Sequence, residues 1–173
     1  MDIIIDILQL IIPPSIVGVA VYYVLKKMLE ENERKRIWEY RKENQKVITP
    51  LRLQAYERIT IFLERISIPS LIVRLNTPGM TAGKLHRDML KVINAEYEHN
   101  LSQQIYISRD AWIVVKNAKE NTLKFINLVA KRVDANAPAM ELIKALTDAV
   151  MESQSTASEV ALEFIKKEVR RLF

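Results

Sequence analysis

Apolar side chains recur every three or four residues along most of the chain, and this spacing predicts helices. From residue 49 onward no stretch alternates long enough to predict a strand. Loops are predicted at 76–83, which holds two of the three glycines, and at 134–138. Ser108 is expected to cap one helix, Thr81 another, and Thr156 with Glu159 to form a capping box. The pattern predicts an all-α fold in which about four or five helices form an antiparallel bundle.

The N-terminus departs from this amphipathic pattern. The segment from Ile3 to Leu25 contains one charged residue, Asp6. As a helix it would extend ~34 Å, enough to cross a hydrocarbon core of ~30 Å. A basic leader and a small-residue cleavage site are missing, which favours a retained anchor over a signal peptide. We therefore expect a transmembrane anchor over residues 1–28.

Pro13 and Pro14 predict a kink in that anchor at 13–14, because each removes a backbone donor. Two arrangements fit the sequence. In one, a single kinked helix crosses the bilayer. In the other, residues 1–12 lie at the interface, the span runs over 14–29, and Lys26 and Lys27 extend to the headgroups.

Charge predicts the orientation of the anchor. Two aspartates and no basic residue precede the span. The basic residues that follow it, and that we expect at the membrane surface, are Lys26, Lys27, Arg34, Lys35 and Arg36. Basic residues favour the cytoplasmic side, so the N-terminus is expected outside and the C-terminal domain in the cytoplasm. A charged helical stalk is predicted over 29–48. Thr49 and Pro50 then resemble an N-cap and first helical position, so the bundle domain is predicted over 49–173.

Composition narrows the possible functions. The chain has no cysteine, which excludes disulfides, thiolate metal sites and cysteine nucleophiles. The net charge of +5 suits anionic partners, and a juxtamembrane region alone can account for it. The sequence therefore favours the lipid bilayer and a protein partner or a second copy over nucleic acid.

Glu96 and His99 are the one pair with a metal-site spacing, that of carboxylate-bridged helical bundles. Such sites need a second pair and two further glutamates. The only other histidine, His86, has Gly83 three positions before it. We interpret Glu96 and His99 as a polar pair, and expect no metal, no cofactor and no catalytic residues.

Three polar residues fall on the apolar face of the helix predicted over 84–105: His86, Asn100 and Gln104. Buried amides are costly unless they are hydrogen-bonded. We therefore expect these three to form a buried polar network that fixes helix register, with a contact to a ligand or partner as the alternative.

Several stretches resemble an uncharacterised family of short membrane-anchored proteins from Bacteroidetes-type bacteria. They are LRLQAYERITIFLERI at 51–66, EYEHNLSQQIYIS at 96–108, and the following AW at 111–112. The resemblance implies a membrane anchor and a bacterial inner-membrane setting, and it brings no activity or catalytic residues.

Three functions are compatible with the sequence. The first is a non-enzymatic, membrane-tethered interaction module, such as an adaptor or an accessory subunit of an inner-membrane complex. The second is a membrane-recruited protein that contacts nucleic acid or the ribosome through basic helix faces. The third is a metal-dependent helical-bundle enzyme built on Glu96 and His99. The lack of a complete catalytic constellation favours the first.

Overall fold

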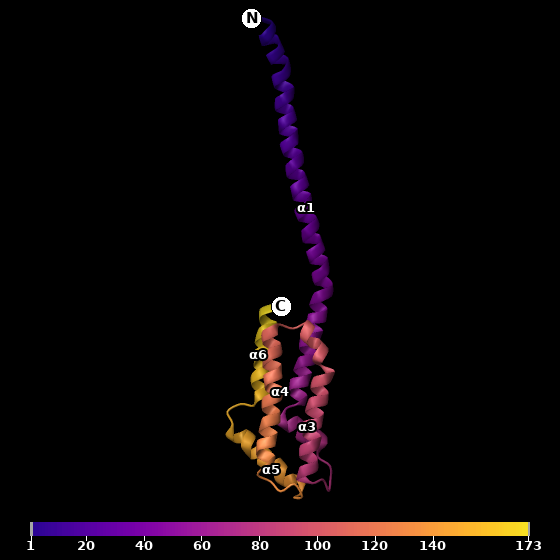
Figure 1. The fold of residues 1–173 in the computed structure, drawn as a ribbon, viewed down its shortest axis with the longest axis vertical. Helices are drawn as coiled ribbons and strands as arrows, with labels where there is room; N and C mark the ends of the chain where they lie inside the picture. Colours follow the sequence, from indigo (N-terminus) through magenta and orange to yellow (C-terminus); the bar gives the residue numbers. More distant parts are fainter. Residues whose placement is uncertain (1, 173) are drawn as a thin grey trace. The chain divides into compact units, whose positions relative to one another are not determined.

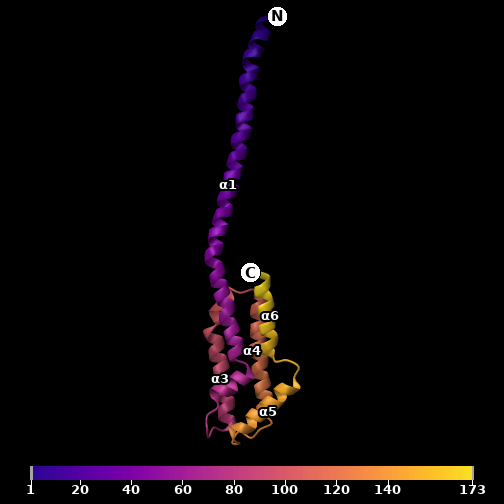
Figure 2. The same ribbon diagram turned by 180° about the vertical axis from the view of Figure 1, so that it is seen from behind.

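The computed structural model describes the backbone of residues 2–172 and the side chains of 16, 18, 21–40 and 42–172. Figure 1 and Figure 2 show a chain of helices, which confirms the all-α prediction. The chain divides into two compact units, Met1–Thr49 and Pro50–Phe173. Over the described residues the elements are α1 (Asp2–Arg65), α2 (Ile68–Leu75), α3 (Ala82–His99), the 3-10 helix η1 (Leu101–Ile105), α4 (Arg109–Ala130), α5 (Ala139–Glu152) and α6 (Ala157–Leu172).

The first unit consists of helical backbone that belongs to α1. Every side chain described between 21 and 49 is exposed, including the five basic residues Lys26, Lys27, Arg34, Lys35 and Arg36. Within the described part of the chain, no helix combines the length and apolar character needed to cross a bilayer. Most of the predicted anchor lies outside the residues whose side chains are described, namely 1–15, 17, 19 and 20.

Helix α1 passes through Pro13, Pro14 and Pro50 without ending. The predicted new helix start at Thr49 is therefore wrong, although the two units divide directly after it. The φ angle of proline is compatible with a helix. Inside a helix its ring removes one backbone hydrogen bond and crowds the carbonyl four residues earlier, at a cost of about 3 kcal/mol.

Side-chain caps define where the helices of the second unit begin. The Thr81 hydroxyl accepts from the Lys84 N–H at 3.3 Å, and the Ser108 hydroxyl accepts from the Ala111 N–H at 3.0 Å. At the start of α6, the Thr156 N–H donates to Glu159 Oε2 at 2.9 Å, and the Glu159 N–H donates back to the Thr156 hydroxyl at 3.4 Å. These contacts confirm the three predicted caps, each of which satisfies orphan donors of a first turn.

Helix α4 is central to the second unit, because it packs against α3, α5 and α6. Its apolar face is fully or almost fully buried and comprises Ala111, Val115, Ala118, Ile126 and Val129. Burying a large aliphatic side chain stabilises a fold by about 1.5–3 kcal/mol. The core thus forms around the helical stripe that the sequence pattern predicts.

A close backbone approach connects the start of α3 to the loop before α5. The Gly83 N–H donates to the Ala135 carbonyl at 2.9 Å, and the Ala82 N–H donates to the Ala137 carbonyl at 2.8 Å. A Cβ at position 83 would lie 3.0 Å from both Cβ and O of Ala135, so glycine is the residue that fits. Nearby, Gly79 has φ of 77°, a left-handed conformation that glycine adopts without strain.

Candidate interaction groove between α1 and α6

An apolar groove of about 290 Å³ runs between the last part of α1 and the C-terminal half of α6. Tyr56 and Ile165 form its buried floor, each with 1% of its surface exposed, whereas Leu53 on the wall is 47% exposed. The remaining lining residues are Glu57, Thr60, Lys166, Val169 and Arg170. On each helix these residues recur at spacings of three or four, so each helix contributes one continuous face.

Tyr56 connects three distant parts of the second unit. Its hydroxyl donates to Glu168 Oε1 at 3.1 Å and accepts from the Ser108 N–H at 3.3 Å. Glu168 is 6% exposed, and its Oε2 is the one buried side-chain polar atom without a partner among the described residues. The Tyr56 hydroxyl is therefore the one side-chain donor that bonds the buried Glu168 carboxylate within the described part of the chain.

Burial raises the pKa of the Tyr56 phenol above its ordinary value of 10.0. The Ser108 N–H opposes this rise because it stabilises the phenolate, whereas the neighbouring Glu168 carboxylate adds to it. Arg52 lies close by and donates from Nε to the Tyr106 carbonyl at 3.1 Å.

The rims of the groove differ in charge. Lys166 and Arg170 are exposed on the α6 side, and Glu57 is exposed on the α1 side. An apolar floor between two helices with charged rims is the geometry that binds amphipathic helices in many complexes.

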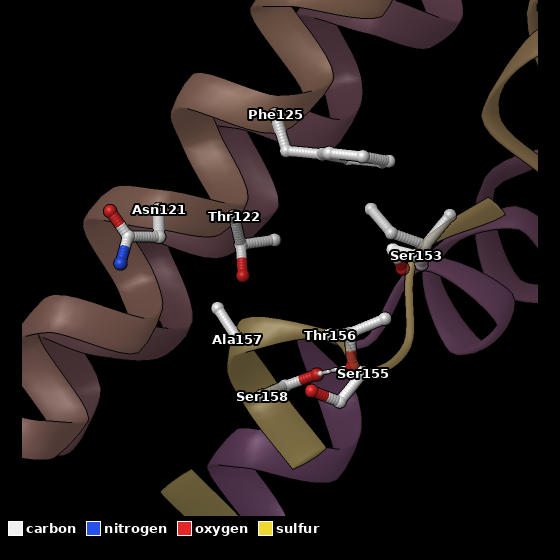
Figure 3. A pocket seen from close by; sticks show the side chains of 9 residues that line it. Asn121, Thr122, Phe125, Ser153, Ser155, Thr156, Ala157 and Ser158 are labelled. Atoms are coloured by element: carbon white, nitrogen blue, oxygen red, sulfur yellow. Dashed lines mark hydrogen bonds between the residues drawn. The ribbon is translucent and has the colours of Figure 1, made fainter. Parts of the chain in front are cut away.

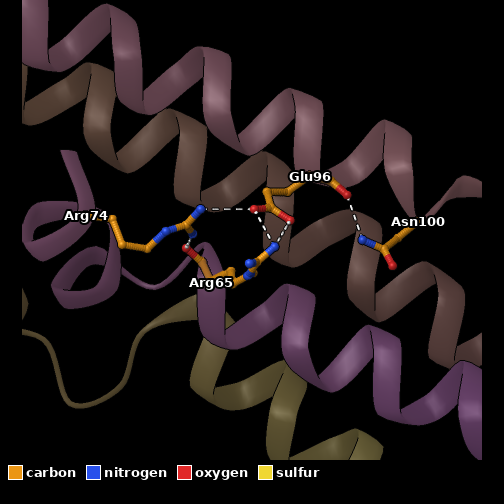
Figure 4. A network of polar contacts seen from close by, with 4 residues as sticks. All are labelled: Arg65, Arg74, Glu96 and Asn100. Atoms are coloured by element: carbon orange, nitrogen blue, oxygen red, sulfur yellow. Dashed lines mark hydrogen bonds and ion pairs between the residues drawn. The ribbon is translucent and has the colours of Figure 1, made fainter.

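The Glu96 carboxylate forms ion pairs with two arginines, Arg65 and Arg74 (Figure 4). Arg65 Nη1 donates to both carboxylate oxygens at 3.0 and 3.1 Å, and Arg74 Nη2 donates to Oε1 at 3.1 Å. Arg74 also donates to the Arg65 carbonyl at 3.3 Å, close to the end of α1. The predicted partner His99 is exposed, and Glu96 pairs with arginines instead. Over the described side chains, no group of three or more potential metal-binding residues occurs.

The residues expected to form one polar network have separate partners. His86 Nε2 lies 2.8 Å from Asn127 Oδ1, whereas the Asn100 amide donates to the Glu96 carbonyl at 2.8 Å. Gln104 is exposed, which corrects the predicted burial. The reason is that α3 ends at His99, where Asn100 leaves helical geometry (ψ 3°). Gln104 lies in the following 3-10 helix η1, so it does not continue the apolar face of α3.

The sequence analysis missed Tyr56 and Glu168. Tyr56 adjoins the apolar stripe of α1 beside Ala55 and Ile59, where an aromatic ring is unremarkable. The position of Glu168 in the sequence could have predicted its burial. It lies three residues after Ile165 in the stripe that continues to Leu172, so its carboxylate is placed among apolar positions.

The sequence model of DUF7935, described as a family of unknown function, matches residues 2–172. No curated protein and no solved structure matches the chain.

Replacing Tyr56 with Phe should lower the free energy of unfolding by about 1–3 kcal/mol, because Glu168 and the Ser108 N–H both lose their partner. Combining Tyr56→Phe with Glu168→Met should recover part of that loss, since the unpaired buried carboxylate is removed as well. Urea unfolding of the full chain in detergent measures both. Tyr106→Phe, at a position with 39% exposure, is the control and should change stability by less than about 0.5 kcal/mol. Simple additivity of the two substitutions would contradict the direct bond.

Alkaline pH should weaken the fold. The unfolded chain releases the Tyr56 proton near its ordinary pKa of 10.0, whereas the folded chain holds it to a higher pH. The Tyr56 contribution to the free energy of unfolding should therefore be constant below the ordinary pKa of 10.0. It should fall as pH rises from that value through the higher pKa of the folded chain. Burial also raises the pKa of Tyr97, which adds to the effect. Measured between about pH 8 and about pH 11, the fall should be smaller in Tyr56→Phe than in Tyr106→Phe. Equal slopes in these two variants would show that Tyr56 ionises normally.

Proposed function

Because the chain belongs to the DUF7935 family, whose function is unknown, we propose one from its geometry: a membrane-tethered, non-catalytic interaction module. In this proposal the groove between α1 and α6 binds an amphipathic helix of a partner protein. The observation that carries the proposal is the groove itself, with buried Tyr56 and Ile165 at its floor and exposed Leu53 at its edge.

Charge specifies the occupant. Lys166 and Arg170 on the α6 rim favour a partner helix with carboxylates along that flank. Glu57 on the opposite rim disfavours acidic residues there, so the acidic flank can face only α6. The apolar stripe of the partner would lie against Leu53 and Val169. This pattern places the acidic flank of the bound helix against α6.

The tether is the N-terminal segment. From Ile3 to Leu25 only Asp6 is charged, and Lys26 and Lys27 follow directly. Such a segment supports insertion in a bilayer with the basic end on the cytoplasmic side. We propose the inner membrane of a bacterium as the setting, with the N-terminus outside and the groove in the cytoplasm.

A photo-crosslinking residue in place of Leu53 should capture the partner in native membranes. Mass spectrometry of the cross-linked peptide should identify an amphipathic segment with acidic residues on one flank. A synthetic peptide of that segment should then bind the purified full chain, and Leu53→Asp should weaken this binding by about tenfold or more. Arg170→Glu should weaken it by about three- to tenfold, through lost charge complementarity.

Matched controls lie on α4. Ile113 is 45% exposed, close to the exposure of Leu53, and Lys116 is an exposed cation away from the groove. The cross-linker at Ile113 should not capture the segment, and Ile113→Asp and Lys116→Glu should bind the peptide normally. A cross-link from Leu53 to a second copy of this chain, to lipid or to nucleic acid would overturn the proposed occupant.

Deleting residues 1–28 should move the protein from the membrane fraction to the soluble fraction. Because the chain has no cysteine, orientation can be measured with single cysteines at Asp2 and at exposed Ser153. In spheroplasts a membrane-impermeant thiol reagent should label Asp2→Cys and leave Ser153→Cys unlabelled until the membrane is broken. Retention of the truncated chain in membranes at high salt would refute the single anchor, and the opposite labelling pattern would refute the orientation.

A further inference from the structure

A second cavity, of about 160 Å³, lies where α4 meets the loop before α6 and the first turn of α6 (Figure 3). Thr122 and Phe125 of α4 form one side, and Ser155, Thr156 and Ser158 form the other. Ile68 of α2 contributes an apolar patch to the lining. The cavity lies at the opposite end of α6 from the groove residues, so its occupant is independent of the proposed partner helix.

Thr122 supplies a hydroxyl with no partner. The residue is 6% exposed, and within the described part of the chain its hydroxyl makes no hydrogen bond. By contrast, the helical threonines Thr60 and Thr147 each donate to the carbonyl four residues earlier at 2.9 Å. In Figure 3 the Thr122 oxygen points across the cavity toward the first turn of α6. The Thr122 residue is buried, but its side chain lines the cavity, so a hydroxyl that makes no bond within the protein is free to bond a ligand there.

The lining indicates a neutral occupant, because no lining side chain is charged. The N–H groups of Ala157 and Ser158 lie in the first turn of α6, where the helix supplies no acceptor. That helix end already has a carboxylate, because the Thr156 N–H donates to Glu159 Oε2 at 2.9 Å. An anionic ligand would meet this charge, whereas a neutral carbonyl or hydroxyl would not.

Phe125 gives the cavity a flat wall. Figure 3 shows its ring edge-on above the space between Thr122 and Thr156, so the ring face covers that space. Aromatic faces pack well against planar groups in an offset arrangement. The Phe125 ring, the Thr122 hydroxyl and the uncharged lining together favour a planar, neutral ligand that can accept a hydrogen bond.

We propose that this cavity binds a small neutral planar molecule, such as an aromatic amide or a pyrimidine base. The ring of the ligand stacks on Phe125, and its carbonyl accepts a hydrogen bond from the Thr122 hydroxyl. Nicotinamide and uracil are suitable probes, and nicotinate is the charged counterpart of the first.

The experiment follows isoleucine methyl signals by NMR in the full chain in detergent. Nicotinamide or uracil should shift the Ile68 methyl signal in a saturable way and leave that of Ile165, in the separate groove, unchanged. Nicotinate should bind at least about tenfold more weakly than nicotinamide, because it carries a charge into an uncharged site.

Variants then test the two contacts. Thr122→Val and Phe125→Leu should each weaken binding by about three- to tenfold, and Thr122→Ser, which keeps the hydroxyl, should restore it to within about twofold. Thr147→Val is the control, because the Thr147 hydroxyl bonds to the Ile143 carbonyl outside the cavity. Unchanged Ile68 signals with both neutral probes would mean that the cavity holds only water and would overturn the proposal. Equal binding of nicotinate, or normal binding by Thr122→Val, would also overturn it.

Discussion

The Tyr56 hydroxyl is the contact on which the geometry of the second unit depends. It accepts a hydrogen bond from the N–H of Ser108, at the start of α4, and donates one to Oε1 of the buried Glu168 carboxylate in α6. A carboxylate removed from water is costly unless a donor faces it, so α1 and α6 have little freedom to slide past one another. The groove lies between these two helices, and Tyr56, which forms the contact, is part of its floor.

Helix α6 serves a different structural purpose at each end. Its first turn is capped by Thr156 and Glu159 and closes the small cavity beside Phe125. Its C-terminal half forms the basic wall of the groove, with buried Ile165 below and exposed Arg170 above. The extensive packing of α6 on α4 holds both ends in place, which allows one short helix to shape two separate surfaces.

Local features of this fold could be predicted from the sequence and distant ones could not. The caps at Thr81, Ser108 and Thr156 depend on residues within one turn, and all three were predicted. The end of α3 at His99 and the exposure of Gln104 depend on where the chain turns, which helical spacing does not encode. The groove needed the pairing of Tyr56 with Glu168, and only the odd carboxylate in the apolar stripe of α6 hinted at it.

The separation of Tyr56 and Glu168 by 112 residues also has a kinetic consequence. Contacts between distant residues form late in folding, because the entropy of closing a long loop must be lost before the contact contributes. Helix α6 lines both the groove and the cavity, so neither of them exists until α6 has packed against the rest of the unit.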